Sequence, residues 1–123
     1  MKAAIVVLSD PKGGEESLGR LFNALAAAHE FKQRKDQVEL VFQGAGTRWV
    51  EEVRKPDHPA RALYEAVQDT VVGVSCACAD VFGARKDVEK SGLPLLTANP
   101  IPGTSGLASL ARYAADGFTV MTF

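Results

Sequence analysis

Both cysteines of the chain lie in one short segment, residues 73–83 with the sequence GVSCACADVFG, as Cys76 and Cys78. A cysteine thiolate is a nucleophile and a metal ligand, and two thiols can also form a redox pair. Free cysteine is equally among the most buried residue types, so packing is an open role for both. The segment therefore has four interpretations: packing residues, a metal fragment, a redox pair or a working thiol.

The spacing of the two cysteines disfavours a metal centre and a disulfide. Cys-x-Cys has no second cysteine pair, and only His29 and His58 remain to complete a set of four zinc ligands. On a strand, the two side chains would stand on one face about 6.6 Å apart, near the upper limit for a disulfide. The pair also differs from the Cys-x-x-Cys of thioredoxin-like sites. We expect no metal and no other cofactor.

The position of Cys78 suits a nucleophile better than the position of Cys76. Cys78 falls between a predicted strand and a helix expected to begin near Asp80. The unpaired N–H groups and the dipole of a helix N-terminus favour a thiolate, whereas the Asp80 carboxylate works against one. Cys76 falls inside the strand, which favours packing. From the residues alone, a structural role stays open for both thiols.

Five short runs rich in β-branched residues predict the strands that position these cysteines. Most are apolar at consecutive positions, which is typical of strands buried on both faces of a parallel sheet. The runs are residues 3–9, 38–43, 71–76, 94–97 and 119–123.

Helical patterns separate the predicted strands. They cover residues 18–31, 47–55, 60–69, 79–92 and 104–117. We expect Pro59 in the first turn of the third helix, with Asp57 or His58 as its cap, and Thr104 or Ser105 as the cap of the last. This alternation predicts one domain, residues 1–123, with a three-layer α/β/α fold and a five-stranded, mainly parallel sheet.

The loops that leave the carboxyl ends of parallel strands gather at one edge, where ligands bind. The loop after the second strand holds Gly44, Gly46 and Thr47, and the loop after the fourth holds Asn99 and Gly103. Glycine permits close backbone approach there. We therefore predict that these five residues, together with Cys76, line a binding site around Cys78.

Composition excludes several classes of function. The 123 residues are 46% hydrophobic and 24% charged, and the formal net charge is −1, so the basic field that nucleic-acid binding requires is missing. The apolar run at the start ends at Ser9 and Asp10 without a cleavage pattern, and no stretch approaches the roughly 18 apolar residues of a membrane span. We expect a cytoplasmic protein that binds neither nucleic acid nor membrane.

Several segments together resemble the DsrE/DsrF-like family, which has the YchN-like fold. The segments are MKAAIVVLSD, VELVFQGAGTRWVEEV, KPDHPARALYEAVQD, GVSCACADVFG and ADGFTVMTF, and together they cover essentially the whole chain. The resemblance implies a five-stranded α/β/α domain that forms homo-oligomers such as trimers or hexamers. In sulfur-relay members, the cysteine after the third strand carries a persulfide, and that position matches Cys78. Some relatives carry a second cysteine where this chain has Ser75.

The resemblance favours a cytoplasmic sulfur carrier, of the sulfurtransferase type, that exchanges sulfur with a donor or acceptor protein. Cys78 would be the nucleophile. Two alternatives remain: a non-catalytic oligomer that binds a small ligand with the cysteine lining the pocket, and a scaffold that does neither. A base such as His58 near Cys78 would change the mechanism, and the sequence does not place it there.

Overall fold

The computed structural model describes residues 1–123 and confirms the five-stranded parallel sheet. The strand order is β4-β3-β2-β1-β5, and every neighbouring pair is parallel. The strands are β1 (Lys2–Val7), β2 (Gln37–Phe42), β3 (Val71–Ser75), β4 (Leu95–Leu96) and β5 (Thr119–Thr122). Consecutive burial along β1 and the second half of β2 explains their continuous apolar runs.

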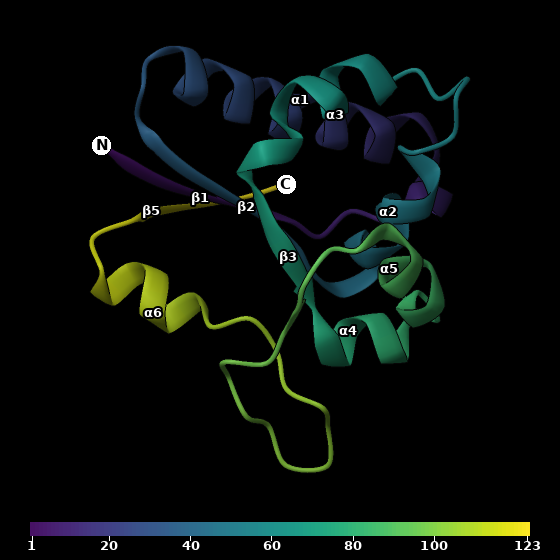
Figure 1. The fold of residues 1–123 in the computed structure, drawn as a ribbon, viewed down its shortest axis with the longest axis vertical. Coiled ribbons are helices and arrows are strands. Elements are labelled where there is room, and N and C mark those ends of the chain that lie inside the picture. The colour runs from purple at the N-terminus through teal and green to yellow at the C-terminus, as the bar shows by residue number, and fades with distance from the viewer.

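Helices cover both faces of the sheet, which confirms the three-layer α/β/α fold. Figure 1 shows α1 (Gly14–Gln33) and α3 (Arg61–Val67) on one side, with α4 (Cys76–Val81), α5 (Arg85–Ser91) and α6 (Leu110–Ala115) on the other. The short helix α2 (Trp49–Glu52) continues from η2 (Gly44–Arg48). Two further 3₁₀ turns, η1 (Pro11–Gly13) and η3 (Gln68–Thr70), precede α1 and β3.

The apolar stripe of α1 packs on the sheet as its spacing predicts. Leu21 and Leu25 are fully buried in one cluster with Ile5, Leu40 and Phe42. Burying each such side chain contributes roughly 1.5–3 kcal/mol. This cluster anchors the strands whose carboxyl ends carry the loops of interest.

Two predicted helices on the second face begin or divide differently. The pattern over residues 79–92 forms two helices, because the chain turns between them at Gly83, whose φ is 70°. The first of them begins at Cys76, with Ser75 in the N-cap position, so the predicted start near Asp80 is wrong. The last helix begins at Leu110 rather than near residue 104, since Ser109 accepts a hydrogen bond from the Arg112 N–H and caps it.

The helices of the second connection are also shorter than their patterns predict. Residues 47–55 divide between η2 and α2, and α3 begins at Arg61 with Ala60 as its N-cap, so Pro59 precedes the first turn. None of the helices combines the length and the apolar character needed to cross a membrane.

Candidate functional site

Cys76 and Cys78 both belong to the first turn of α4, which follows directly from the carboxyl end of β3 (Figure 1). Both are free thiols and both are buried, with 3% of Cys76 and 8% of Cys78 exposed. Because both residues are helical, their side chains point about 200° apart around the helix axis instead of sharing a strand face. The two sulfurs therefore have different surroundings.

Arg85 supplies a positive charge beside Cys76. The turn at Gly83 brings α5 back along α4, and Arg85 Nη1 donates to the Sγ of Cys76 at 3.5 Å and to Asp80 Oδ1 at 3.0 Å. The hydrogen bond with Asp80 raises the pKa of Arg85, so its guanidinium stays charged. Arg85 lies nine residues after Cys76 in the chain, and only the turn at Gly83 returns it to the cysteine.

Asp80 holds a neighbouring loop to α4 through its carboxylate. The hydroxyl of Ser105 donates to Asp80 Oδ2 at 2.6 Å, and this bond, followed by the one from Arg85, lowers the pKa of Asp80. Asp80 thus ties together α4, α5 and the loop. The carboxylate is fully ionised at neutral pH, and part of its charge is balanced by Arg85.

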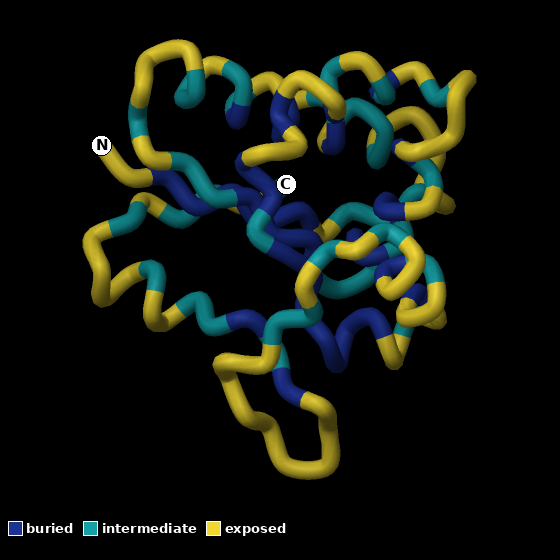
Figure 2. The backbone as a smooth tube through the Cα atoms, viewed as in Figure 1, coloured by how far each residue is buried: buried dark blue, intermediate teal, exposed yellow.

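The segment of residues 97–109, here called the cover loop, contacts the first turn of α4 at two backbone positions as well. The Ala77 N–H donates to the Gly106 carbonyl at 2.8 Å, and the Ala108 N–H donates to the Ser75 hydroxyl at 3.1 Å. Figure 2 shows the tip of this loop exposed, and of its returning side Gly106 and Ala108 are buried. These contacts hold the cover loop against the start of α4.

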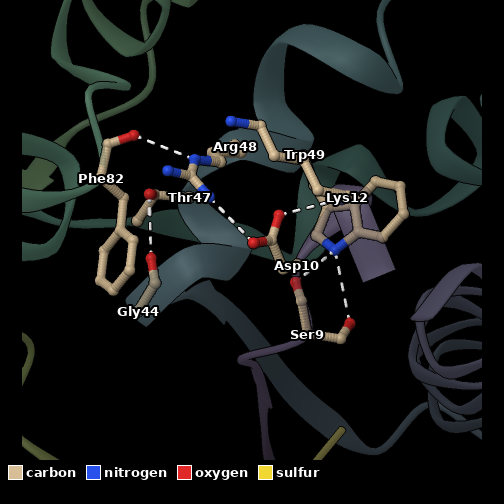
Figure 3. Close-up of polar contacts among 8 residues, drawn as sticks. All are labelled: Ser9, Asp10, Lys12, Gly44, Thr47, Arg48, Trp49 and Phe82. Carbon is tan, nitrogen blue, oxygen red and sulfur yellow. Dashed lines mark hydrogen bonds and ion pairs between the residues drawn. The ribbon is translucent and has the colours of Figure 1, made fainter. Parts of the chain in front are cut away.

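A second cluster fixes the neighbouring loops at the same edge of the sheet (Figure 3). Arg48 Nη1 forms an ion pair with Asp10 Oδ2 at 2.9 Å, and its Nε donates to the Phe82 carbonyl at 3.1 Å. The guanidinium carbon also lies 5.4 Å from the centroid of the Phe82 ring. Trp49 Nε1 donates to the Ser9 carbonyl at 2.7 Å. These contacts hold the loop after β1, η2 and the end of α4 in one arrangement.

The predicted binding residues of η2 have packing roles in this arrangement. Gly46 and Thr47 are buried, and a Cβ on Gly46 would lie 2.1 Å from the Val7 carbonyl oxygen. Thr47 Oγ1 donates to the Gly44 carbonyl, and Gly44 has a φ of 59°. Although η2 packs against α4, these contacts explain the presence of Gly44, Gly46 and Thr47 without a ligand. The role of these residues in binding stays a prediction.

The predicted binding residues of the fourth loop lie in the cover loop. Asn99 pairs with Leu107 as an isolated antiparallel bridge, with N–H to carbonyl distances of 2.8 and 2.9 Å. Gly103 is exposed, with a φ of 79°. Their role in binding also stays a prediction.

His58 has a structural position at the start of α3. Its Nδ1 accepts from the Ala60 N–H at 3.1 Å, and its ring meets Trp49 edge-on with centroids 6.0 Å apart. These contacts involve neither cysteine, and because the N-cap of α3 is Ala60, the predicted cap at Asp57 or His58 is wrong. No group of three or more cysteine, histidine or carboxylate side chains is arranged to hold a metal ion.

Comparison with known proteins also leads to the family that the sequence resembles. The model of the DsrE/DsrF-like family matches residues 1–123. An uncharacterized protein of Methanocaldococcus jannaschii is 25% identical over 121 residues, which are 98% of this chain and 94% of that protein.

Two solved structures share the fold. The ychN protein from E. coli superposes with a TM-score of 0.59 and 23% identity over the full length of both chains. A conserved protein of unknown function from Bacteroides thetaiotaomicron superposes with a TM-score of 0.60 and 14% identity, over 98% of this chain and 94% of that one.

Proposed function

The chain belongs to the DsrE/DsrF-like family, and on this premise we propose that it carries sulfur as a cysteine persulfide, with Cys78 as the thiol that accepts it. The observation that carries the proposal is the placement of two free thiols and one arginine at the carboxyl edge of the sheet. Cys78 is the more exposed of the two thiols. An incoming persulfide would therefore meet Cys78 first.

The proposed reaction is an exchange between two sulfur atoms that needs no oxidant. The Cys78 thiolate attacks the outer sulfur of a donor persulfide, R–S–SH, and a new S–S bond forms on Cys78. The S–S bond of the donor breaks at the same time, and its electron pair leaves with the donor as a thiolate, R–S⁻. The proton that Cys78 loses passes to water, and transfer to an acceptor thiolate reverses these events.

Cys76 is proposed as a residue that lines the site. Its sulfur already accepts the hydrogen bond of Arg85, and it is the more deeply buried of the two thiols. Arg85 thus holds one positive charge against the sulfur of Cys76, at the edge of the sheet where the exchange is proposed to occur. A serine at position 76 keeps an acceptor for this hydrogen bond, so loading at Cys78 should survive that change.

The surroundings of α4 set the conditions for access. Because both thiols are buried, we expect a local opening of the structure, such as release of the cover loop from α4, before a donor reaches Cys78. We propose that the donor and the acceptor are proteins, that the carrier works in the cytoplasm, and that it assembles as a trimer or hexamer. Analytical ultracentrifugation of the purified chain tests the assembly, and a monomer at all concentrations contradicts it.

The sulfur-carrier proposal is tested with glutathione persulfide as donor. Wild type, Cys78→Ser and Cys76→Ser are exposed to it, freed of the donor, and analysed by intact-protein and peptide mass spectrometry. We expect one added sulfur on wild type and on Cys76→Ser, and none on Cys78→Ser. Equal loading of wild type and Cys78→Ser contradicts the assignment, and a failure of every variant to load favours a non-catalytic binding protein.

A further inference from the structure

On the second face of the sheet, which carries α6 (Figure 1), residues of α6 and of the strands line a cavity of about 510 Å³. The cavity lies beside the first residues of β1, β2 and β3, and α6 closes it from the other side. Its volume falls within the roughly 300–1,000 Å³ of typical small-molecule sites. None of the predicted site residues lines it.

The walls of this cavity are partly apolar. Val72, Leu96 and Ala108 contribute aliphatic surface. Tyr113 and Phe118 form an aromatic wall, with ring centroids 5.0 Å apart in an edge-to-face arrangement. A ligand with a hydrocarbon or aromatic part can therefore bury that part here.

Two opposite charges in the cavity have no intramolecular partner. Glu39 projects from the middle of β2, is only partly exposed, and its carboxylate takes part in no hydrogen bond or ion pair. Arg112 on α6 is exposed, its guanidinium also has no intramolecular partner, and it does not pair with Glu39. By contrast, the Lys2 ammonium donates to the Asp116 carbonyl at 3.2 Å and lies 5.4 Å from the Phe118 ring centroid.

The charged lining is balanced overall, with Lys2 and Arg112 opposite in sign to Glu39 and Asp116. A balanced lining gives no net attraction for a polyanion such as a nucleotide. Two unpaired charges, one on β2 and one on α6, instead match a ligand that carries both signs.

Tyr113, which follows Arg112 on α6, adds a neutral hydroxyl to the lining. Its burial, and next the charge of Glu39, raise the pKa of Tyr113 to about 12, so the phenol stays protonated at neutral pH. The hydroxyl has no intramolecular hydrogen bond and can donate to a ligand carboxylate.

We propose that this cavity binds a small zwitterion of the amino-acid type. The ligand ammonium pairs with Glu39, its carboxylate with Arg112 and the Tyr113 hydroxyl, and its apolar part packs between the aromatic wall and the aliphatic surface. The site is separate from the cysteines and does not depend on the sulfur-carrier proposal.

Ligand-observed NMR and isothermal titration calorimetry on the full chain test this inference. The standard amino acids are screened at millimolar concentration, together with phenethylamine and 3-phenylpropanoate, which match L-phenylalanine without its carboxylate or its ammonium. We expect at least one apolar amino acid to bind, more tightly than either single-charge analogue. The amide signals of Glu39, Ala108 and Tyr113 should shift on binding.

Charge-neutral variants assign the contacts. Glu39→Gln should weaken zwitterion binding about tenfold or more, and Arg112→Gln should do the same, as expected for one lost charge-assisted hydrogen bond. Arg20→Gln, which removes an exposed ion pair with Glu16 on α1, should leave binding unchanged. The proposal is overturned if no amino acid binds, or if both variants bind as tightly as wild type. It is also overturned if both variants change the oligomeric state, because a second copy of the chain then covers this face.

Discussion

Replacing Gly46 by alanine tests whether this glycine serves packing or leaves room for a ligand. The added Cβ would lie 2.1 Å from the Val7 carbonyl oxygen, 2.8 Å from the Val7 carbonyl carbon and 3.3 Å from the Leu8 Cα. All three are backbone atoms, so no side chain can rotate away. The Val7 carbonyl also accepts a hydrogen bond from the Gln43 N–H at 3.0 Å, which any shift of the backbone weakens.

The expected cost of Gly46→Ala combines overpacking with this hydrogen bond. Overpacking a dense site costs about 1–3 kcal/mol, and a hydrogen bond contributes about 1 kcal/mol. A total of about 3 kcal/mol should lower Tm by on the order of 10 °C in a domain of this size. Thermal and urea unfolding measure the change directly.

Gly19→Ala is the matched control. Gly19 lies inside α1, and a Cβ there meets no atom within 4 Å. Because alanine favours the helix, this variant should gain about 0.5–1 kcal/mol. If Gly46→Ala is as stable as wild type, the packing argument is wrong and the glycine is free for a ligand.

Three further predictions concern the groups around the site and the cavity. Ser105→Ala removes the hydroxyl that holds the cover loop to Asp80. Losing a hydrogen bond of about 1 kcal/mol should raise the population of the open loop, and with it the alkylation rate of Cys78, about fivefold; an unchanged rate contradicts a covering role. The fold lowers the pKa of Asp80 from 3.8, so its bonds to Ser105 and Arg85 stabilise the fold above that pH and cease to do so as pH falls through the lower folded value. The urea midpoints of wild type and Asp80→Asn should therefore converge in acid, and a constant difference contradicts this. Because the fold raises the pKa of Tyr113 from 10.0 to about 12, the unfolded state loses the phenol proton first, and the free energy of unfolding should fall between these pH values. Tyr113→Phe should show less of this fall, and the phenolate absorbance of the folded protein should appear only near the higher pKa.

The sheet could be predicted from sequence because its strands are buried on both faces. Ile5, Val7 and Leu40 lie in continuous apolar runs that no amphipathic helix would contain, and the glycines and prolines between runs mark the loops. The stripe of Leu21 and Leu25 likewise specifies which face of α1 meets the sheet.

The candidate site was less predictable because its contacts join distant elements. The local sequence pattern predicts one helix over residues 79–92. Only the left-handed turn at Gly83 brings Arg85 into contact with Cys76. Ser105 resembles a helix cap in sequence, yet its hydroxyl reaches Asp80, while Ser109 caps the helix. Glu39 lies in an ordinary strand pattern, and its lack of a counterion is visible only once the cavity is formed by distant elements.

The measurement that tests the central claim most directly is the alkylation rate of each cysteine in the folded wild-type protein, determined over a range of pH by peptide mass spectrometry. The account predicts that Cys78 reacts in the folded state while Cys76 stays protected. Protection of both thiols until the protein unfolds would contradict it, because a buried pair without access cannot exchange sulfur with a donor.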